Sequence, residues 1–168
     1  PAQAGELQGA RILVMSKTAG YRHASIPAGQ AALLDVARQE GFTVTFTEDA
    51  AQFNDGDLGR FDAVVFLNTT GNVLNGDQQV AFERYIQAGG GFVGIHAAAD
   101  TEYGWPWYNK LVGAYFKSHP NNPNVRKAVI NVTDQDHPST KDLPAKWERN
   151  DEWYNYKDIN PDLKVLAR

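Results

Sequence analysis

The chain has 168 residues, of which 42% are apolar, and its net charge at pH 7 is -4. These values suit one globular domain with a substantial core, and the lack of any basic run argues against a nucleic-acid-binding surface. The chain contains no cysteine, which excludes disulfides and thiol catalysis, and it has no apolar segment of membrane-spanning length.

The first nine residues, PAQAGELQG, are small and polar. We expect residues 1–9 to be a disordered remnant, left either by removal of a signal peptide or simply by where the sequence starts. The first alternative predicts an exported protein, periplasmic or extracellular, and the second leaves a cytoplasmic one.

Four strands are expected in the first part of the chain. Residues 11–15, 63–67 and 92–95 are continuously apolar, which is typical of strands buried on both faces of a parallel sheet. Residues 42–47 alternate Phe or Val with Thr, so one face is polar and the strand suits the edge of the sheet.

Two helices are expected between these strands. The first should begin near Ser25 as its cap, with Pro27 in its first turn, and end at Gly41. The second should cover residues 77–88. Alternating strands and helices predict a flavodoxin-like, doubly wound α/β fold with a mainly parallel sheet in three layers, α/β/α.

The flavodoxin-like strand order 2-1-3-4-5 places the 42–47 strand at an edge and the three apolar strands in the centre. Ligands of such folds bind beyond the carboxyl ends of the strands. Further strands are expected at 127–132 and 163–167. Because the chain stops just after the last of these, we expect one domain over 10–168 that lacks its C-terminal end.

The segment GGGFVGIHAAAD, residues 89–100, has the layout of a strand-to-helix elbow in which small neighbours expose one functional side chain. That side chain is His96. His23 follows the first strand, so both histidines should reach the same sheet edge, and His119 could approach it. The alternative for a single histidine is a hydrogen bond that caps a loop.

Carboxylates and aromatic side chains surround this edge in the sequence. Asp100 and Glu102 follow the elbow, and Asp151 and Glu152 lie among aromatic residues that could raise a carboxyl pKa. Solvated loops or pairing with Arg149 are the alternatives. The aromatic residues could stack on a sugar ring or simply pack loops onto the sheet; they are Tyr103, Trp105, Trp107, Trp153 and Tyr154.

Three histidines and a carboxylate would meet the ligand count of a zinc site. Their spacing matches no compact ligand motif, so we expect no metal ligands and no required cofactor, with a divalent metal as the less favoured alternative.

Several long motifs resemble the ThuA-like family, named for trehalose utilisation: KTAGYRHASI, FLNTTGNVL, GGGFVGIHAAADTEYGWPWYNKLVGAYFKSHP and DHPSTKDLPAKWERNDEWYNY. The resemblance covers the chain from Ala10 onward. It implies a fold related to class I glutamine amidotransferases, with the elbow cysteine replaced by His96 and without amidotransferase activity. It also implies a link to glycoside or keto-sugar breakdown.

We therefore expect a carbohydrate-processing hydrolase or lyase that uses His96 with Glu152 or Asp100 as acid and base. The alternatives are a non-catalytic carbohydrate-binding module and a protein-interaction domain. The expected partner is a small carbohydrate, with no nucleic acid or membrane, and self-association is left open. The side chains expected to bind substrate are His23, Thr69, Thr70, Glu102, Trp105, Trp107, His119, Asp151 and Tyr154.

Overall fold

A computed structural model describes residues 7–168, which form two compact units, one ending at Tyr108 and the other covering Asn109–Arg168. The sequence predicted one domain over 10–168. Of the predicted disordered segment 1–9, residues 1–6 lie outside the described residues. Within the remainder, the N–H of Gly9 donates to the carbonyl of Gly41 over 2.8 Å.

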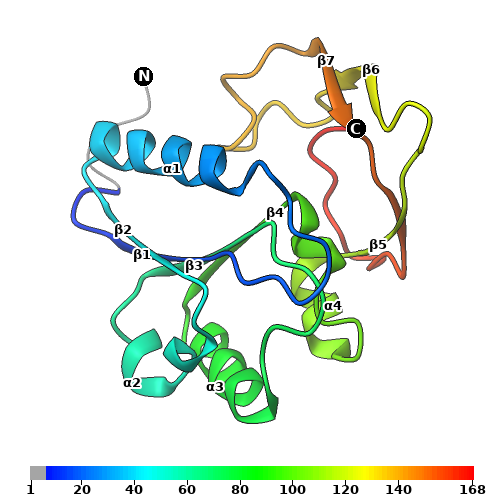
Figure 1. Cartoon of the computed structure of the whole chain (residues 1–168). Coiled ribbons are helices and arrows are strands. Elements are labelled where there is room, and N and C mark those ends of the chain that lie inside the picture. The colour runs from blue at the N-terminus through cyan, green and yellow to red at the C-terminus, as the bar shows by residue number, and fades with distance from the viewer. Residues whose placement is uncertain (1–6) are drawn as a thin grey trace. The chain divides into compact units, whose positions relative to one another are not determined.

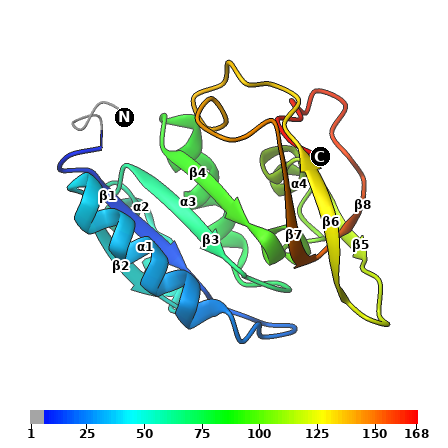
Figure 2. The same ribbon diagram turned by 90° about the horizontal axis from the view of Figure 1, so that it is seen from above.

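The first unit is built on a four-stranded parallel sheet with the order β2-β1-β3-β4 (Figure 2). This order matches the first four positions of the predicted flavodoxin-like sheet. The strands are β1 (Arg11–Met15), β2 (Thr43–Thr47), β3 (Ala63–Leu67) and β4 (Gly91–Ile95).

Helices lie on both faces of this sheet, which gives the predicted three layers (Figure 1). Helix α1 covers one face, and α2 and α3 lie on the other. The helical elements of the unit are α1 (Ile26–Glu40), α2 (Asp55–Leu58), α3 (Gly76–Gln87) and the short 3-10 segments η1 (Ala50–Gln52) and η2 (His96–Asp100). Helix α4 (Pro106–Val112) follows.

The ends of α1 show which local signals the sequence carried. Pro27 lies in the first turn and Gly41 ends the helix with a left-handed backbone, φ 77°, as predicted. Ser25 is the N-cap residue of α1, as predicted. Ser25 makes no capping hydrogen bond, and its hydroxyl instead accepts a hydrogen bond from Asn68 Nδ2 over 3.0 Å.

Each face of the sheet has its own core. Under α1, Val14, Val65 and Leu67 are buried together. On the opposite face the core is aromatic. The rings of Phe66 and Phe82 stack with their centroids 5.6 Å apart, and Phe53 and Phe92 pack edge to face against Phe82 and Phe66, each with centroids 5.5 Å apart.

The 92–95 strand differs from its prediction. It forms the end of the sheet among the described strands, paired with β3 alone, rather than a central strand. Val93 on its α1 side remains 50% exposed, while Phe92 packs against Phe66. The apolar run therefore predicted burial along both faces of the strand, whereas on the α1 side Val93 is exposed and only Ile95 packs against the core.

The second unit contains two antiparallel strand pairs, β5 with β8 and β6 with β7. The predicted strand at 127–132 falls largely within β6. The predicted strand at 163–167 was wrong, because only an isolated bridge joins Val132 to Ala167. The strands are β5 (Tyr115–Ser118), β6 (Val125–Asn131), β7 (Lys146–Glu152) and β8 (Asn155–Lys157).

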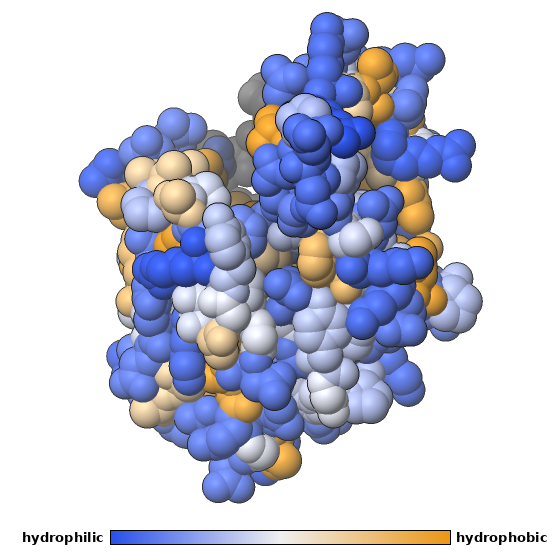
Figure 3. Space-filling model, turned by 45° about the vertical axis from the view of Figure 1, so that its right-hand side comes forward, coloured by the Kyte–Doolittle hydropathy of each residue, from blue (hydrophilic) through white to orange (hydrophobic). Residues whose placement is uncertain are grey.

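Among residues 7–168 no helix combines the length and apolar character that crossing a membrane requires. The surface in Figure 3 is mainly hydrophilic, with apolar side chains in small separate groups. Such scattered groups are ordinary on folded proteins.

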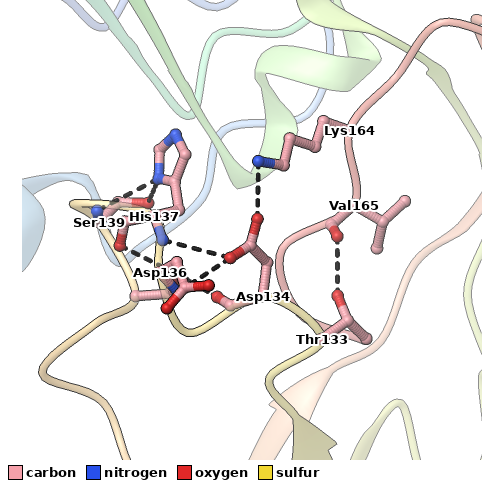
Figure 4. Close-up of polar contacts among 8 residues, drawn as sticks. Thr133, Asp134, Asp136, His137, Ser139, Lys164 and Val165 are labelled. Carbon is pink, nitrogen blue, oxygen red and sulfur yellow. Dashed lines mark hydrogen bonds and ion pairs between the residues drawn. The ribbon is translucent and has the colours of Figure 1, made fainter.

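Asp134 organises the turn that follows β6 (Figure 4). Its Oδ1 accepts hydrogen bonds from the backbone N–H groups of Asp136 and His137, and its Oδ2 lies 2.6 Å from Lys164 Nζ. His137 Nδ1 in turn accepts from the N–H of Ser139. The hydrogen bond from Lys164, followed by that from Asp136, holds the pKa of Asp134 below its usual value.

We expect Gly90→Ala to destabilise the first unit by about 1–3 kcal/mol, because overpacking a tight contact costs this much. A Cβ at this position would clash with the ring of Tyr85. Urea denaturation measures the change. The control is Gly76→Ala, which meets nothing within 4 Å and should be neutral or stabilising. Equal effects of the two variants would contradict the assigned contact.

Lys164→Ala should raise the pKa of Asp134 toward its ordinary value. Because the folded-state pKa is lowered, the Asp134 carboxylate contributes stability above its unfolded pKa and loses it as the pH falls through the folded value. A carbon-detected NMR titration of Asp134 measures this. Lys141→Ala, in the same turn, should leave the titration unchanged, and a shift of equal size there would show that general charge is responsible.

Candidate functional site

The parallel register of β3 and β4 ends at matched positions, where Leu67 pairs with Ile95. The next residue of each strand has a left-handed backbone, with φ 52° at Asn68 and φ 51° at His96. A non-glycine residue in this region costs about 1–3 kcal/mol and persists only where its surroundings hold it. Two such residues side by side mark this edge of the sheet as strained.

His96 therefore lies at the predicted elbow, followed by the small buried residues Ala97, Ala98 and Ala99. Its half-buried ring meets His23, which lies between β1 and α1. The two Nε2 atoms are 3.2 Å apart, and the rings lie edge to face with centroids 4.8 Å apart. The structure thus brings together two of the predicted histidines from positions 73 residues apart.

The segment that carries His23 is anchored on both sides. Tyr21 packs edge-on against the His23 ring at 4.9 Å, and its carbonyl accepts a hydrogen bond from Thr70 Oγ1 over 2.8 Å. Arg22 makes two hydrogen bonds to Glu48, of 2.7 and 3.1 Å, and this contact raises the pKa of the guanidinium. These contacts fix where the imidazole is presented.

Thr69 and Thr70 were predicted to bind substrate, but both are fully buried. The Thr69 hydroxyl lies 2.8 Å from that of Thr101, and Thr70 Oγ1 also accepts from the N–H of Gly20. Both hydroxyls are engaged inside the fold. Their position assigns them to joining the loops after β1, β3 and β4 rather than to contact with a ligand.

Glu102 was also predicted to bind substrate, yet it is 1% exposed. Its Oε1 accepts from the N–H groups of Val73 and Leu74 at 2.7 and 2.8 Å, and its Oε2 accepts from Gln79 Nε2 at 2.8 Å. A buried carboxylate with such donors is an internal anchor. It holds the loop after β3 to the segment after η2.

The aromatic residues predicted to bind a sugar ring lie in different units, with Trp105 and Trp107 in the first and Tyr154 in the second. Trp105 is buried, donates from Nε1 to Glu83 and stacks on Trp107 at 5.0 Å, and both rings pack near Phe82 of α3. These two residues belong to the core of the α3 face.

Asp100, predicted as catalytic, accepts a 2.5 Å hydrogen bond from the hydroxyl of Tyr103.

A polar hollow of about 480 Å³ opens at the carboxyl ends of β1, β2 and β3. Its lining includes Lys17, Glu48, Asn72 and Gln78. Glu48 accepts the hydrogen bonds of Arg22, and Arg22 directly precedes His23. The hollow therefore lies next to the segment that carries His23. Amide, ammonium and carboxylate groups of this kind suit a ligand rich in hydroxyl groups.

The other predicted site residues lie in the second unit. His119 Nδ1 is 3.0 Å from the carbonyl of Pro120, so it carries the proton, and Nε2 lies 3.6 Å from Glu152 Oε1. Tyr154 stacks on His119 with centroids 6.2 Å apart. Asp151 forms an exposed ion pair with Arg149 at 2.7 Å, the structural alternative considered from the sequence.

Sequence reasoning found His23 and His96, and it placed Asn68 at the same edge of the sheet without giving it a role, although its left-handed backbone follows the end of β3. The available signal was the motif FLNTT, because Asn is enriched in left-handed conformations and here directly follows a buried strand. The predicted partnership of His96 with Glu152 joins residues of different units and stays a prediction.

Two solved structures are similar to this chain. A protein described as ThuA-like from Bacteroides uniformis ATCC 8492 is 28% identical, with a TM-score of 0.79 over 99% of this chain and 70% of its own. A second, from Parabacteroides merdae ATCC 43184, is 23% identical, with a TM-score of 0.65 over 88% of this chain and 63% of its own, and supports the fold alone.

No curated protein matches the chain. The family model for ThuA, described as trehalose utilisation, matches residues 11–168, which include both units and the histidine pair. The chain belongs to the ThuA family.

Proposed function

We propose that the chain is an enzyme that breaks a glycoside or keto-sugar by proton transfer at the pair formed by His23 and His96. The observation that carries the proposal is the 3.2 Å approach of their Nε2 atoms at the strained carboxyl edge of the sheet. Neutral imidazole can either accept or donate a proton near neutral pH, which acid–base catalysis needs.

The pair is suited to elimination from a 3-keto glycoside. One imidazole lone pair removes the proton on the carbon beside the carbonyl. The electrons of that C–H bond form a C=C bond as the C–O bond to the leaving sugar breaks, and the leaving oxygen takes a proton from the N–H of the second imidazole. The neighbouring Nε2 atoms of His23 and His96 can perform both proton transfers, and the reaction needs no covalent nucleophile.

Hydrolysis is the second form of the same chemistry. One imidazole removes a proton from water as the water oxygen bonds to the anomeric carbon, the glycosidic C–O bond breaks, and the leaving oxygen takes a proton from the N–H of the second imidazole. The polar hollow at the carboxyl ends of β1, β2 and β3 supports a carbohydrate in either case, because its amide and carboxylate groups can bind hydroxyls. The family description, trehalose utilisation, points to the same class of substrate. Asp100, Glu152 and the aromatic rings of the second unit remain candidate contributors.

His96→Ala should lower kcat on 3-keto-trehalose or trehalose about 10²–10⁴-fold, the usual contribution of a positioned acid or base. Sugar binding, measured by calorimetry, should be largely retained. His137→Ala is the matched control, because this imidazole is bound to Ser139 in a separate turn, and it should keep full turnover. Binding without turnover by the unaltered chain would identify a carbohydrate-binding module, and neither binding nor turnover would favour an interaction domain.

Asn72→Trp should raise KM for the same sugar tenfold or more with little change in kcat, because the exposed indole would fill the hollow beside the histidine segment. Steady-state kinetics measures both constants. Thr45→Trp fills a different hollow of about 300 Å³, near the amino ends of β1 and β2, and should leave KM unchanged. A greater effect of Thr45→Trp would place the sugar elsewhere.

A further inference from the structure

We infer that His23, His96 and Asn68 form a binding site for a divalent transition-metal ion such as Zn²⁺ or Co²⁺. The inference adds a metal ion to the site of the proposed function. Only the role of the ion toward a substrate rests on the proposed function. Binding of the ion itself depends on the three side chains and can be measured without sugar.

The separation of the two histidine nitrogens fits one shared ion. At a metal–nitrogen distance of about 2.0–2.1 Å, two nitrogens on one ion lie about 2.9 Å apart at a right angle and about 3.4 Å apart at a tetrahedral angle. The two Nε2 atoms are 3.2 Å apart, between these values.

The orientation of the rings supports the same conclusion. If the N–H of one ring and the lone pair of the other lay on a single line, the ring centroids would lie about 5.5 Å apart. They are 4.8 Å apart, with an interplanar angle of 83°. At least one ring axis is therefore inclined to the line between the nitrogens, which two imidazoles that point at a third atom also require.

Asn68 provides the independent observation. It is 4% exposed, and its Oδ1 is buried without a hydrogen-bond partner among the described residues. Such an orphaned acceptor costs about 1–3 kcal/mol, and a water or ion is among its ordinary explanations.

The contacts of Asn68 join it to the segments that carry the two histidines. Its Nδ2 donates to the hydroxyl of Ser25, two residues beyond His23, and its backbone N–H donates to the carbonyl of Ile95, directly before His96. The amide oxygen is thus presented at the same edge by a strained left-handed backbone. Two imidazoles and one oxygen leave positions open for water or a substrate oxygen, as catalytic metal sites do.

Nitrogen and oxygen donors of this kind suit zinc, cobalt or nickel, whereas calcium and magnesium prefer oxygen alone. A bound ion would polarise the carbonyl of a keto-sugar or lower the pKa of a bound water. His23 and His96 would then hold the ion through their lone pairs, so the proton transfers proposed for the two imidazoles would belong to the ion-free chain.

Titration of the full chain with Zn²⁺ alone, by calorimetry, should show one ion per chain. His23→Ala and His96→Ala should each weaken binding at least tenfold, while the control His137→Ala should match the unaltered chain. Co²⁺ should give visible d–d absorption bands that disappear in the same two variants. Absence of binding by the unaltered chain, or unchanged binding by both variants, would overturn the inference.

Two further measurements keep the test decisive if His96→Ala does not fold. Asn68→Ala should weaken Zn²⁺ binding, and Asn68→Asp should retain it, since a carboxylate also offers oxygen. Zn²⁺ should raise the Tm of the unaltered chain and of His137→Ala alike, because an ion that binds only the folded state stabilises it. Equal Zn²⁺ affinity in Asn68→Ala and the unaltered chain would remove Asn68 from the site.

The two proposals can fail separately. Turnover of the keto-sugar that persists in chelator, by a chain that binds no Zn²⁺, would leave the proposed function in place and overturn the metal site. Stoichiometric Zn²⁺ binding without turnover of any sugar tested would do the reverse.

Discussion

The parallel pairing of β3 with β4 is the constraint on which the candidate site depends. Parallel strands in register end at the same level, so whatever follows Leu67 and Ile95 must emerge together. The chain continues with a left-handed residue at both places, Asn68 and His96. The backbone conformation is unfavourable on its own, and the pairing of β3 with β4 holds it in place.

A second layer of contacts makes this edge rigid. Isolated parallel bridges extend the sheet beyond its strands, from Thr18 to Thr70 and from Gly71 to Thr101. The buried carboxylate of Glu102 then accepts three hydrogen bonds from the loop after β3 and the start of α3. Buried polar networks that are fully hydrogen-bonded specify one conformation, which is what two opposed imidazoles require.

Sequence patterns predicted the parts of the fold that local chemistry determines. The four strands of the first unit, its helices α1 and α3, and the elbow at His96 follow from hydrophobic patterns and turn residues, whereas the short helix α2 was not predicted. Whether a polar side chain is buried or exposed could not be predicted. Glu102 and Thr69 follow strands in loops, where exposure is the expectation, and only tertiary packing buries them. Trp105 shows the same difficulty, since an aromatic ring in a loop suits either a sugar or a core. The strands β5, β7 and β8 were missed because they are short or mainly polar and their pairing partners lie far away in the sequence or depend on tertiary structure.

The ion pair of Arg22 with Glu48 lies on the surface, with about half of each side chain exposed. Attraction between such groups is weak in water and falls further as dissolved ions screen it. The position of the His23 imidazole therefore depends partly on an ion pair that weakens as ionic strength rises. The position of the His96 imidazole depends on the backbone conformation after β4, which ionic strength does not change. The spacing between them should be most uniform in dilute buffer and broaden in concentrated salt.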